Sequence, residues 1–584
     1  MNKIFRNGLL MLAVGAFVAS CADYNELDGY KADPDPTYTD EYADLDPVKS
    51  YINKADYPQF SMDTYMDLKT YNKQGLDHAV AKTNFDGVAF GYSFMPGSVV
   101  NKKGYMNFLA YKDALSHASE IDMPLYGSPI VANEKQPDDW FGTLTAPVEI
   151  RVLPENDLDL DYSTIDEFTG TVVKGSAVIV KNYDDKGNAL KTSKRSKVYI
   201  VEGFDVDPLG FYTITFMVKS EIDKDETINC TFADSLVNTG KDKDGKLIAK
   251  NFVVRSGGWN TVKVEWVPAK TATQGYLMIE GNLNTVLYIR NVHVEHTPDN
   301  HEPQTAKMMN DTSQYALNKW CDELMEANAG RIKSFDLVDK PLDSKALLDG
   351  VTYEGENVLD LKHATDKIFW QDYLNVFAED GETIVKTGSE LYAATVSKVA
   401  REAFEKHGGD PAALKFFIAE TGLENPQRLA SLKYWIKTWE KNMDGKKIDG
   451  INAELNLTYV EDADNETAVN NFFKSLADYA NADGKLIRIS NFDIKYKDAE
   501  GNSVTAEKIT KEQRKKLADY YAFVINAYLT KIPADKQAGL CKGNMFDTSS
   551  GIGDPVGLWS KSGSDWVRNA TYKGFCDGLS GKKN

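Results

Sequence analysis

The segment Leu486-Ile-Arg-Ile-Ser-Asn-Phe-Asp-Ile494 is a short, β-rich apolar run that is flanked on both sides by helix-like sequence. Apolar residues recur near helical spacing before it, over 468–479, and after it, over 511–530. Strands that alternate with helices of this length are typical of a parallel sheet covered by helices. The segment therefore predicts an α/β domain.

The same alternation occurs in two separate parts of the chain. Residues 49–145 contain helix-like pieces at 65–81 and 108–118, with strand-like runs at 86–92 and 124–131. From about residue 305, helix-like and strand-like pieces alternate again up to the strand-like run 536–541. Two or three strands precede the interruption and about five follow it, which is close to the eight strands of a closed (β/α)8 TIM barrel.

The block between these parts, residues 146–300, has a different pattern. It contains short β-rich runs, several of them alternating with period two, that are separated by Gly, Asp, Asn and Lys turns (171–173, 176–180, 197–201, 211–218, 260–266, 275–281 and 286–294). This pattern is typical of an antiparallel β-sandwich. We therefore expect a barrel formed by residues 49–145 and 301–584, interrupted by an inserted sandwich.

The first residues predict export and a lipid anchor. Lys3 and Arg6 precede an apolar run, Leu9–Val18, that is too short to span a bilayer, and Val18-Ala-Ser-Cys21 follows. This order resembles a bacterial lipobox, which implies a signal peptide at 1–20 and a lipidated Cys21. The alternative is an ordinary signal peptide in which a cysteine stands there by chance.

The following stretch, residues 21–48, is acidic, contains proline and is poor in aliphatic residues, so we expect a flexible tether. Its acidic residues resemble the surface-export signal of Bacteroidetes lipoproteins, and a plain spacer is the alternative. These features predict an outer-membrane or cell-surface location.

Composition restricts the partners. The formal net charge of −20 argues against nucleic acid and against an anionic membrane surface, so the lipid is the expected membrane contact. Apart from Cys21, the cysteines are Cys230, Cys321, Cys541 and Cys576, in no spacing that suggests zinc. We expect no cofactor, and a Cys541–Cys576 disulfide remains open.

The order of the barrel pieces resembles glycoside hydrolase family 10, the endo-1,4-beta-xylanases. Phe335-Asp-Leu-Val-Asp-Lys340 stands where that family has Trp-Asp-Val-Val-Asn-Glu, and Ile489-Ser-Asn-Phe-Asp-Ile494 where it has Ile-Thr-Glu-Leu-Asp-Ile. Ile448–Ile451 and Gly557-Leu-Trp559 resemble its sixth strand and its closing segment. The inserted block resembles carbohydrate-binding modules of families 4 and 22.

The resemblance also implies that the catalytic groups are missing. A retaining glycosidase needs two carboxyl groups about 5–5.5 Å apart, one as acid and one as nucleophile. The family's acid position is Lys340 here and its nucleophile position is Asn491. The supporting histidines are replaced as well. One alternative is a relocated carboxylate pair such as Glu420 with Glu454; another is that Lys340 forms a buried ion pair with Asp339 or Glu454.

The sequence therefore predicts a surface glycan-binding lipoprotein built on a degenerate xylanase-like barrel. It would hold polysaccharide for partner enzymes and an outer-membrane importer; an active endo-acting hydrolase is the alternative. Candidate sugar-binding rings are Trp259, Tyr276, Tyr288 and Trp559. Structural calcium in the insert is a further hypothesis, because the turns 184–188 and 241–246 loosely resemble calcium loops.

Overall fold

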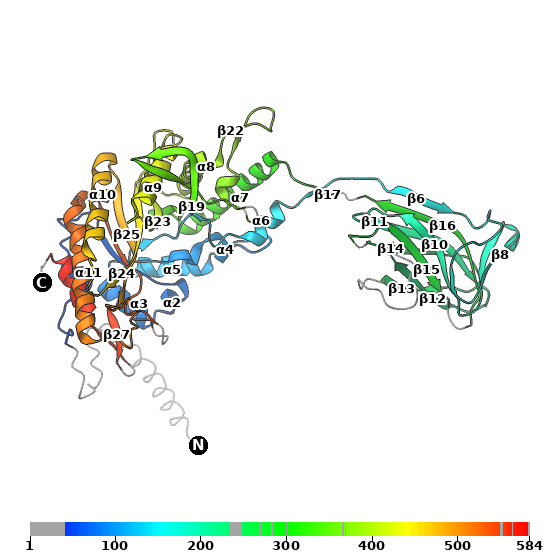
Figure 1. Cartoon of the computed structure of the whole chain (residues 1–584), viewed down its shortest axis with the longest axis horizontal. Helices are drawn as coiled ribbons and strands as arrows, with labels where there is room; N and C mark the ends of the chain where they lie inside the picture. The colour runs from blue at the N-terminus through cyan, green and yellow to red at the C-terminus, as the bar shows by residue number, and fades with distance from the viewer. Residues whose placement is uncertain are drawn as a thin grey trace, which may run out of the picture. The chain divides into compact units, whose positions relative to one another are not determined.

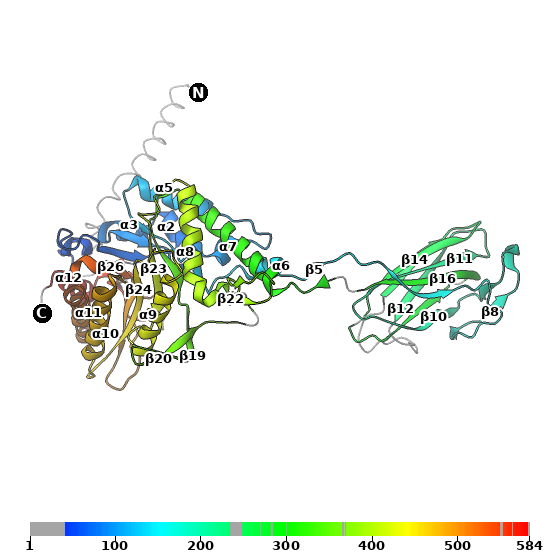
Figure 2. The same cartoon turned by 90° about the horizontal axis from the view of Figure 1, so that it is seen from above.

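The computed structural model describes residues 41–233, 248–268, 270–281, 284–298, 301–364, 367, 369–548, 553–562 and 565–581. The expected signal peptide, Cys21, most of the tether and the turn 241–246 lie outside these residues. The chain divides into two compact units, one of residues 1–145 with 305–584 and the other of residues 146–304. The larger unit is drawn in blue and in green to red in Figures 1 and 2.

The larger unit is a barrel of parallel strands. The strand order is β3-β2-β1-β26-β25-β24-β23-β18-β4, and every neighbouring pair is parallel. β3 and β4 are successive pieces of one barrel position, so the first and last members of this order meet and the sheet closes. The strands are β1 Ser61–Tyr65, β2 Gly87–Ala89, β3 Leu125–Tyr126, β4 Val131–Ala132, β18 Ser334–Asp339, β23 Lys415–Thr421, β24 Gly450–Val460, β25 Leu486–Lys497 and β26 Gln537–Lys542.

Gly127 lies between β3 and β4 and allows the third barrel strand to approach β18, the fourth. It forms a parallel bridge with Phe335, and its N–H donates to the Ser334 carbonyl at 2.9 Å. A Cβ atom at this position would lie 2.0 Å from the Phe335 ring. A side chain would therefore separate the third barrel strand from the fourth.

Helices surround the strands (Figures 1 and 2). Side-chain caps define where several of them begin: Thr387 and Thr510 form capping boxes with Glu390 and Gln513. The helices are α2 Leu68–Lys73, α3 Leu76–Asn84, α4 Pro96–Val99, α5 Leu109–Glu120, α6 Asp138–Leu144, α7 Ala306–Asn328, α8 Gly388–Lys406, α9 Pro426–Glu440, α10 Glu466–Asp483, α11 Lys511–Lys531 and α12 Ala570–Leu579. No helix in the described part of the chain is long and apolar enough to cross a membrane.

The main apolar core lies between the outer faces of the strands and these helices. The interior of the barrel is different, because a small apolar cluster around Tyr126, Phe417 and Cys541 shares it with buried ionisable side chains. Hairpins and short turns complete the unit: η2 Val48–Tyr51, η3 Gly91–Phe94, β19 Leu342–Tyr353 with β20 Glu356–Leu361, η5 Trp370–Asp372, β21 Val376–Phe377 with β22 Ile384–Lys386, η6 Ala534–Lys536, and β27 Trp559–Ser562 with β28 Asp565–Arg568.

The smaller unit is a sandwich of two antiparallel sheets around its own apolar core. One sheet has the order β13-β12-β15-β10-β7, and the other has the order β14-β11-β16-β9-β8 with β6 beside β16. The strands are β6 Glu155–Leu160, β7 Val172–Lys174, β8 Ala177–Val180, β9 Ala189–Thr192, β10 Lys197–Asp205, β11 Phe211–Ser220, β12 Glu226–Ala233, β13 Ile248–Val254, β14 Asn260–Trp266, β15 Gln274–Glu280 and β16 Leu287–Thr297. The short turn η4 Tyr183–Asp185 and a separate pair, β5 Val148–Glu149 with β17 His301–Glu302, complete the unit.

The predicted fold class, a TIM barrel with an inserted antiparallel sandwich, is confirmed. One local prediction is wrong: the helix expected over 65–81 begins only at Leu68, because Ser61–Tyr65 is the first barrel strand. The cysteines Cys230, Cys321, Cys541 and Cys576 are all free, so the open question of a Cys541–Cys576 disulfide is answered in the negative.

Candidate functional site

The carboxyl ends of the barrel strands carry a cluster of charged and hydroxyl side chains. Lys340 directly follows β18, and its Nζ lies 3.1 Å from Glu454 Oε1 on β24 and 4.0 Å from Asp339 Oδ2. The same ammonium donates to the Tyr92 hydroxyl at 2.8 Å, and Tyr92 in turn donates to Asp339. The ion-pair interpretation of Lys340 is therefore the arrangement that the structure contains.

Burial sets the protonation of this cluster. It raises the pKa of Asp339 to about 8, against the partial opposition of the nearby Lys340 charge. Burial alone would lower the pKa of Lys340, but the Asp339 and Glu454 carboxyls outweigh it and the net direction is upward. Near neutral pH the cluster therefore combines a protonated Asp339 with a charged Lys340, whose partner is Glu454.

Asn491 stands on β25, the seventh barrel strand, where the strand pairing is interrupted on both sides. Its φ of 47° lies in the left-handed region, as does the φ of 48° at Lys340. Asparagine tolerates that conformation well, whereas lysine is strained in it. The two positions that the family resemblance singled out thus share an unusual backbone geometry at the same end of the barrel.

Next to Asn491 is a second buried charged group. Asp493 pairs with Lys542 of β26 and accepts from the Asn544 backbone N–H at 3.1 Å. Gly543 makes this possible, since a Cβ atom there would lie 2.5 Å from Asp493 Oδ2 and 3.0 Å from Asn491 Oδ1. The pairing of Asp493 with Lys542 could not be predicted from the sequence, because the two residues belong to different strands.

Glu420 and Glu454 do not form the predicted carboxylate pair. In the register of β23 and β24, Glu420 is opposite Ala453 while Glu454 is opposite Thr421. Adjacent residues of a strand point to opposite faces, so the two glutamates lie on different sides of the sheet. Glu420 is fully buried and accepts from Arg428 Nη2 at 2.8 Å. The pair hypothesis is wrong for this reason, and Glu420 has a structural role.

Arg428, the partner of Glu420, holds several backbone segments together. Besides Glu420 it binds the carbonyl oxygens of Thr421, Leu342 and Asp343. It therefore fixes the loops that follow β18 and β23. Beside these loops lies an open groove of about 600 Å³, whose lining includes Asp343, Lys362, His363, Phe369, Glu424 and Asn425.

The four candidate sugar-binding rings do not form one platform. Trp559 begins β27, is only 6% exposed and packs on Phe546 and Tyr572 in the barrel unit. In the sandwich, Tyr276 lies on β15 of the five-stranded sheet and Tyr288 on β16 of the other sheet. The neighbours of each tyrosine along its strand point into the core, so the two rings lie on opposite outer faces.

The Tyr288 face is largely occupied by the protein itself. Tyr288 is 5% exposed and stacks on Tyr183 at 3.9 Å between ring centroids. Trp259 packs edge-on against Tyr183, and the Arg290 guanidinium lies 4.8 Å from the centre of the Trp259 ring. Of the predicted rings in the sandwich, Tyr276 has the surroundings that suit a sugar best.

Metal binding receives no support from the described residues. They contain no group of three His, Cys, Asp or Glu side chains that could hold a metal ion. In the turn 184–188, Asp184 forms an ion pair with Lys219 at 2.8 Å. The other turn of the calcium hypothesis, 241–246, lies outside the described residues.

Solved structures of xylanases are among the structural neighbours of this chain. No family model matches the sequence, and no curated protein matches it. Xylanase B from Clostridium stercorarium F9 is 12% identical, with 91% of this chain and 100% of that chain covered and a TM-score of 0.49. Endo-1,4-beta-xylanase XylE of Penicillium canescens is 12% identical over 92% and 98% of the two chains, with a TM-score of 0.48. A GH10 structure from Paenibacillus barcinonensis is 12% identical over 89% of this chain and 94% of that chain, with a TM-score of 0.48. At these identities and TM-scores, the neighbours say nothing about the activity of this chain.

Proposed function

We propose that this protein is a surface lipoprotein that binds a xylan-like polysaccharide without cleaving it. One observation carries the proposal: the strand ends that should hold an acid and a nucleophile hold Lys340, paired with Glu454 at 3.1 Å, and Asn491. An ammonium beside an oxocarbenium-like transition state opposes the charge that develops there, and an amide cannot serve as the nucleophile.

The groove beside the loops after β18 and β23 is the proposed binding site on the barrel. Its volume of about 600 Å³ is large enough for a short stretch of a sugar chain. Phe369 offers an aromatic ring, and Asn425, Asp343 and Lys362 offer hydrogen-bond donors and acceptors. Such a mixture suits a neutral ligand that has apolar ring faces and hydroxyl edges.

The outer face of the five-stranded sheet is the proposed second site. Tyr276 hydrogen-bonds to Gln274 at 3.0 Å and packs edge-on against Tyr199. On the same face, four residues farther along the neighbouring strand β12, the Asn229 amide donates to Asn251 Oδ1 of β13 at 2.9 Å. Rings and amides on a solvated sheet face match the groups that bind neutral sugars.

The proposed location and partners rest on the first 48 residues. Cys21 would carry the lipid, and the acidic stretch 21–48 would keep the folded units away from the outer membrane. From there the protein would hold polysaccharide for an outer-membrane importer and for separate hydrolases.

Binding is tested with purified protein, in affinity gels that contain xylans or other polysaccharides, with released reducing sugar measured in parallel. We expect retention by at least one glycan and no release. Phe369→Ala and Tyr276→Ala should each weaken retention, whereas Tyr315→Ala, an exposed ring on α7, should not. Absence of retention on every polysaccharide would refute the proposal.

A second candidate function is hydrolysis by a relocated carboxylate pair, and one observation favours it. Asp339 and Glu454 lie on either side of the Lys340 ammonium, and the pKa of Asp339 is raised to about 8 by burial. A carboxyl that stays protonated near neutral pH is what a general acid requires. In this alternative the carboxylate pair is Asp339 with Glu454, because Glu420 lies on the other side of the sheet from Glu454.

The two functions give different results in the same assay. Hydrolysis predicts released oligosaccharides, with loss of release in both Asp339→Asn and Glu454→Gln. The binding proposal predicts no release from either the wild type or these variants. The double variant Lys340→Glu with Asn491→Glu is informative in a different way, since release by it alone would show that the barrel still binds the glycan in a cleavable position.

A further inference from the structure

Two neighbouring barrel strands hold a lysine and an aspartate in direct contact inside the barrel. Asp493 lies on β25 and Lys542 ends β26, where it is opposite Phe492 in the parallel register. The Lys542 and Asp493 side chains are 0% and 3% exposed, and Lys542 Nζ contacts Asp493 Oδ1. No other lysine–carboxylate pair in the described part of the chain is buried as completely: for Lys485 with Glu440 the exposures are 3% and 17%. The proposed function gives the pair no role.

The surroundings of Lys542 solvate its charge poorly. An ammonium has three N–H donors, and among the described residues Asp493 Oδ1 is the one acceptor that bonds to it. The Tyr521 ring centre lies 5.6 Å from Nζ. Burial lowers the pKa of Lys542, against the partial opposition of the Asp493 carboxylate. Transfer of one proton from Lys542 to Asp493 would leave an uncharged amine beside an uncharged carboxyl and would remove the cost of burying two charges.

The Asp493 carboxyl group is polarised by donors other than the lysine. The Asn544 backbone N–H donates to Oδ1 at 3.1 Å, and the Asn544 side-chain amide donates to Oδ2 at 2.5 Å. N–H groups in such positions stabilise the negative charge that develops on oxygen when a nucleophile attacks a carboxyl carbon. The pair therefore combines a held nucleophile, a polarised carboxyl carbon and a buried setting.

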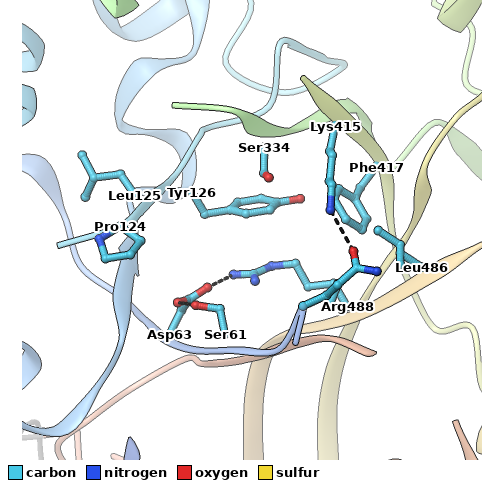
Figure 3. Close-up of a pocket in the computed structure, with 12 residues that line it drawn as sticks. Ser61, Asp63, Pro124, Leu125, Tyr126, Ser334, Lys415, Phe417, Leu486 and Arg488 are labelled. Carbon is cyan, nitrogen blue, oxygen red and sulfur yellow. Dashed lines mark hydrogen bonds and ion pairs between the residues drawn. The ribbon is translucent and has the colours of Figure 1, made fainter. Parts of the chain in front are cut away.

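A second buried pair in the barrel interior shows why the lysine matters. Figure 3 shows Arg488 reaching toward Asp63, and Nη2 lies 2.8 Å from Asp63 Oδ2. A guanidinium remains protonated and its nitrogen lone pairs are delocalised, so Arg488 can form an ion pair but is not a nucleophile. An uncharged lysine amine, in contrast, attacks carbonyl carbon. Of these two pairs, the one that contains Lys542 can react further.

We infer that Lys542 and Asp493 condense to an intramolecular amide, which joins the seventh and eighth barrel strands covalently. The Nζ lone pair attacks Asp493 Cγ, so that an N–C bond forms and the C–O bond to the carboxyl hydroxyl breaks. The proton that nitrogen gives up leaves with that hydroxyl as one water molecule. The step needs no oxidant and no co-reactant. Fixed contact between the two groups replaces a bimolecular encounter, and exclusion of bulk water disfavours hydrolysis of the product.

Intact-mass spectrometry of the purified chain 22–584, unfolded in denaturant, tests this inference independently of glycan binding. Loss of water lowers the mass by about 18 Da from the value calculated from the sequence. The test variant is Lys542→Met, which removes the nucleophile but keeps a long side chain. The matched control is Lys485→Met, which removes the other deeply buried lysine. Peptide mapping of the wild type locates the link directly, so the result does not depend on whether Lys542→Met folds.

We expect the loss of water in the wild type and in Lys485→Met, and the calculated mass in Lys542→Met. The peptides that contain Asp493 and Lys542 should appear as one branched peptide, with no tryptic cleavage after Lys542. In Asp493→Asn the same attack would release ammonia, a loss of about 17 Da, and would give a product identical to that of the wild type. A wild-type chain at its calculated mass would overturn the inference, as would a loss of water that persists in Lys542→Met or maps to other residues.

Discussion

Replacing Asp339 by Asn should remove a large part of the pH dependence of barrel stability. Burial raises the pKa of this carboxyl from 3.8 to about 8 in the folded protein. The folded state therefore binds the proton more tightly, and the stabilisation is complete below about pH 4 and is lost as the pH rises toward 8. At about 1.4 kcal/mol per pKa unit, the full shift corresponds to on the order of 5 kcal/mol.

Asparagine has nearly the same shape and stays neutral at every pH, and its carbonyl oxygen can still accept from Tyr92. We expect the stability of Asp339→Asn, measured relative to the wild type, to rise steadily between pH 5 and pH 8. The rise should be at least ~2 kcal/mol, a part of the full shift that allows for structural relaxation. The assay is calorimetric or urea unfolding between pH 5 and 9, following the transition of the barrel unit because two units need not unfold together.

The control is Asp138→Asn, a neutralisation of an exposed carboxylate in the first turn of α6. Its stability should follow the wild-type pH profile. Parallel profiles for Asp339→Asn and the wild type between pH 5 and 8 would refute the reasoning, because they would mean that Asp339 is ionised throughout that range.

Three further outcomes are expected. Burial and the neighbouring His117 lower the pKa of His78 to about 4, so the protein should lose stability as the pH falls from 6.5 toward 4. The variant His78→Gln should reduce that loss by up to ~3 kcal/mol in urea titrations. Arg514→Met leaves Asp547 buried without its partner at 2.7 Å, so it should lower stability by about 3–5 kcal/mol, while Arg331→Met at an exposed site should change the melting temperature little. The four described cysteines, which are free and buried, should react with a thiol reagent only after unfolding, and rapid labelling of any of them in the native protein would contradict their placement.

The fold could be predicted from sequence because its strands and helices differ in periodicity. Long strands such as β24 and β25 stand out in the sequence, and the change of pattern at residue 146 indicates the insert. The short first strand β1 does not stand out, since Tyr65 also fits the helical spacing of the residues that follow it. Strand β12 does not stand out either, because Glu226, Thr227 and Asn229 make it polar.

The candidate site was only partly predictable. The family resemblance pointed to Lys340 and Asn491, but the strand register decides which face a side chain occupies, and this separates Glu420 from Glu454. The ion pairs inside the barrel cannot be predicted from the sequence, because residues as distant as Asp63 and Arg488 meet only in three dimensions. A signal was present, since Arg488 interrupts the apolar run Ile487–Ile489.

The insertion of the sandwich between the third and fourth barrel strands also determines the order in which the chain can fold during synthesis. β4 ends at Ala132 and its partner β18 begins at Ser334, while β1 must wait for β26, which begins at Gln537. The sandwich is continuous in sequence and has its own core, so it can fold while the first third of the barrel still has unpaired strand edges. Exposed edges of this kind are prone to association with other chains. A nascent chain that has emerged from the ribosome through residue 304 can therefore combine a folded sandwich with a barrel fragment whose strand edges are unpaired, and we expect association with other chains to be favoured at this stage of synthesis.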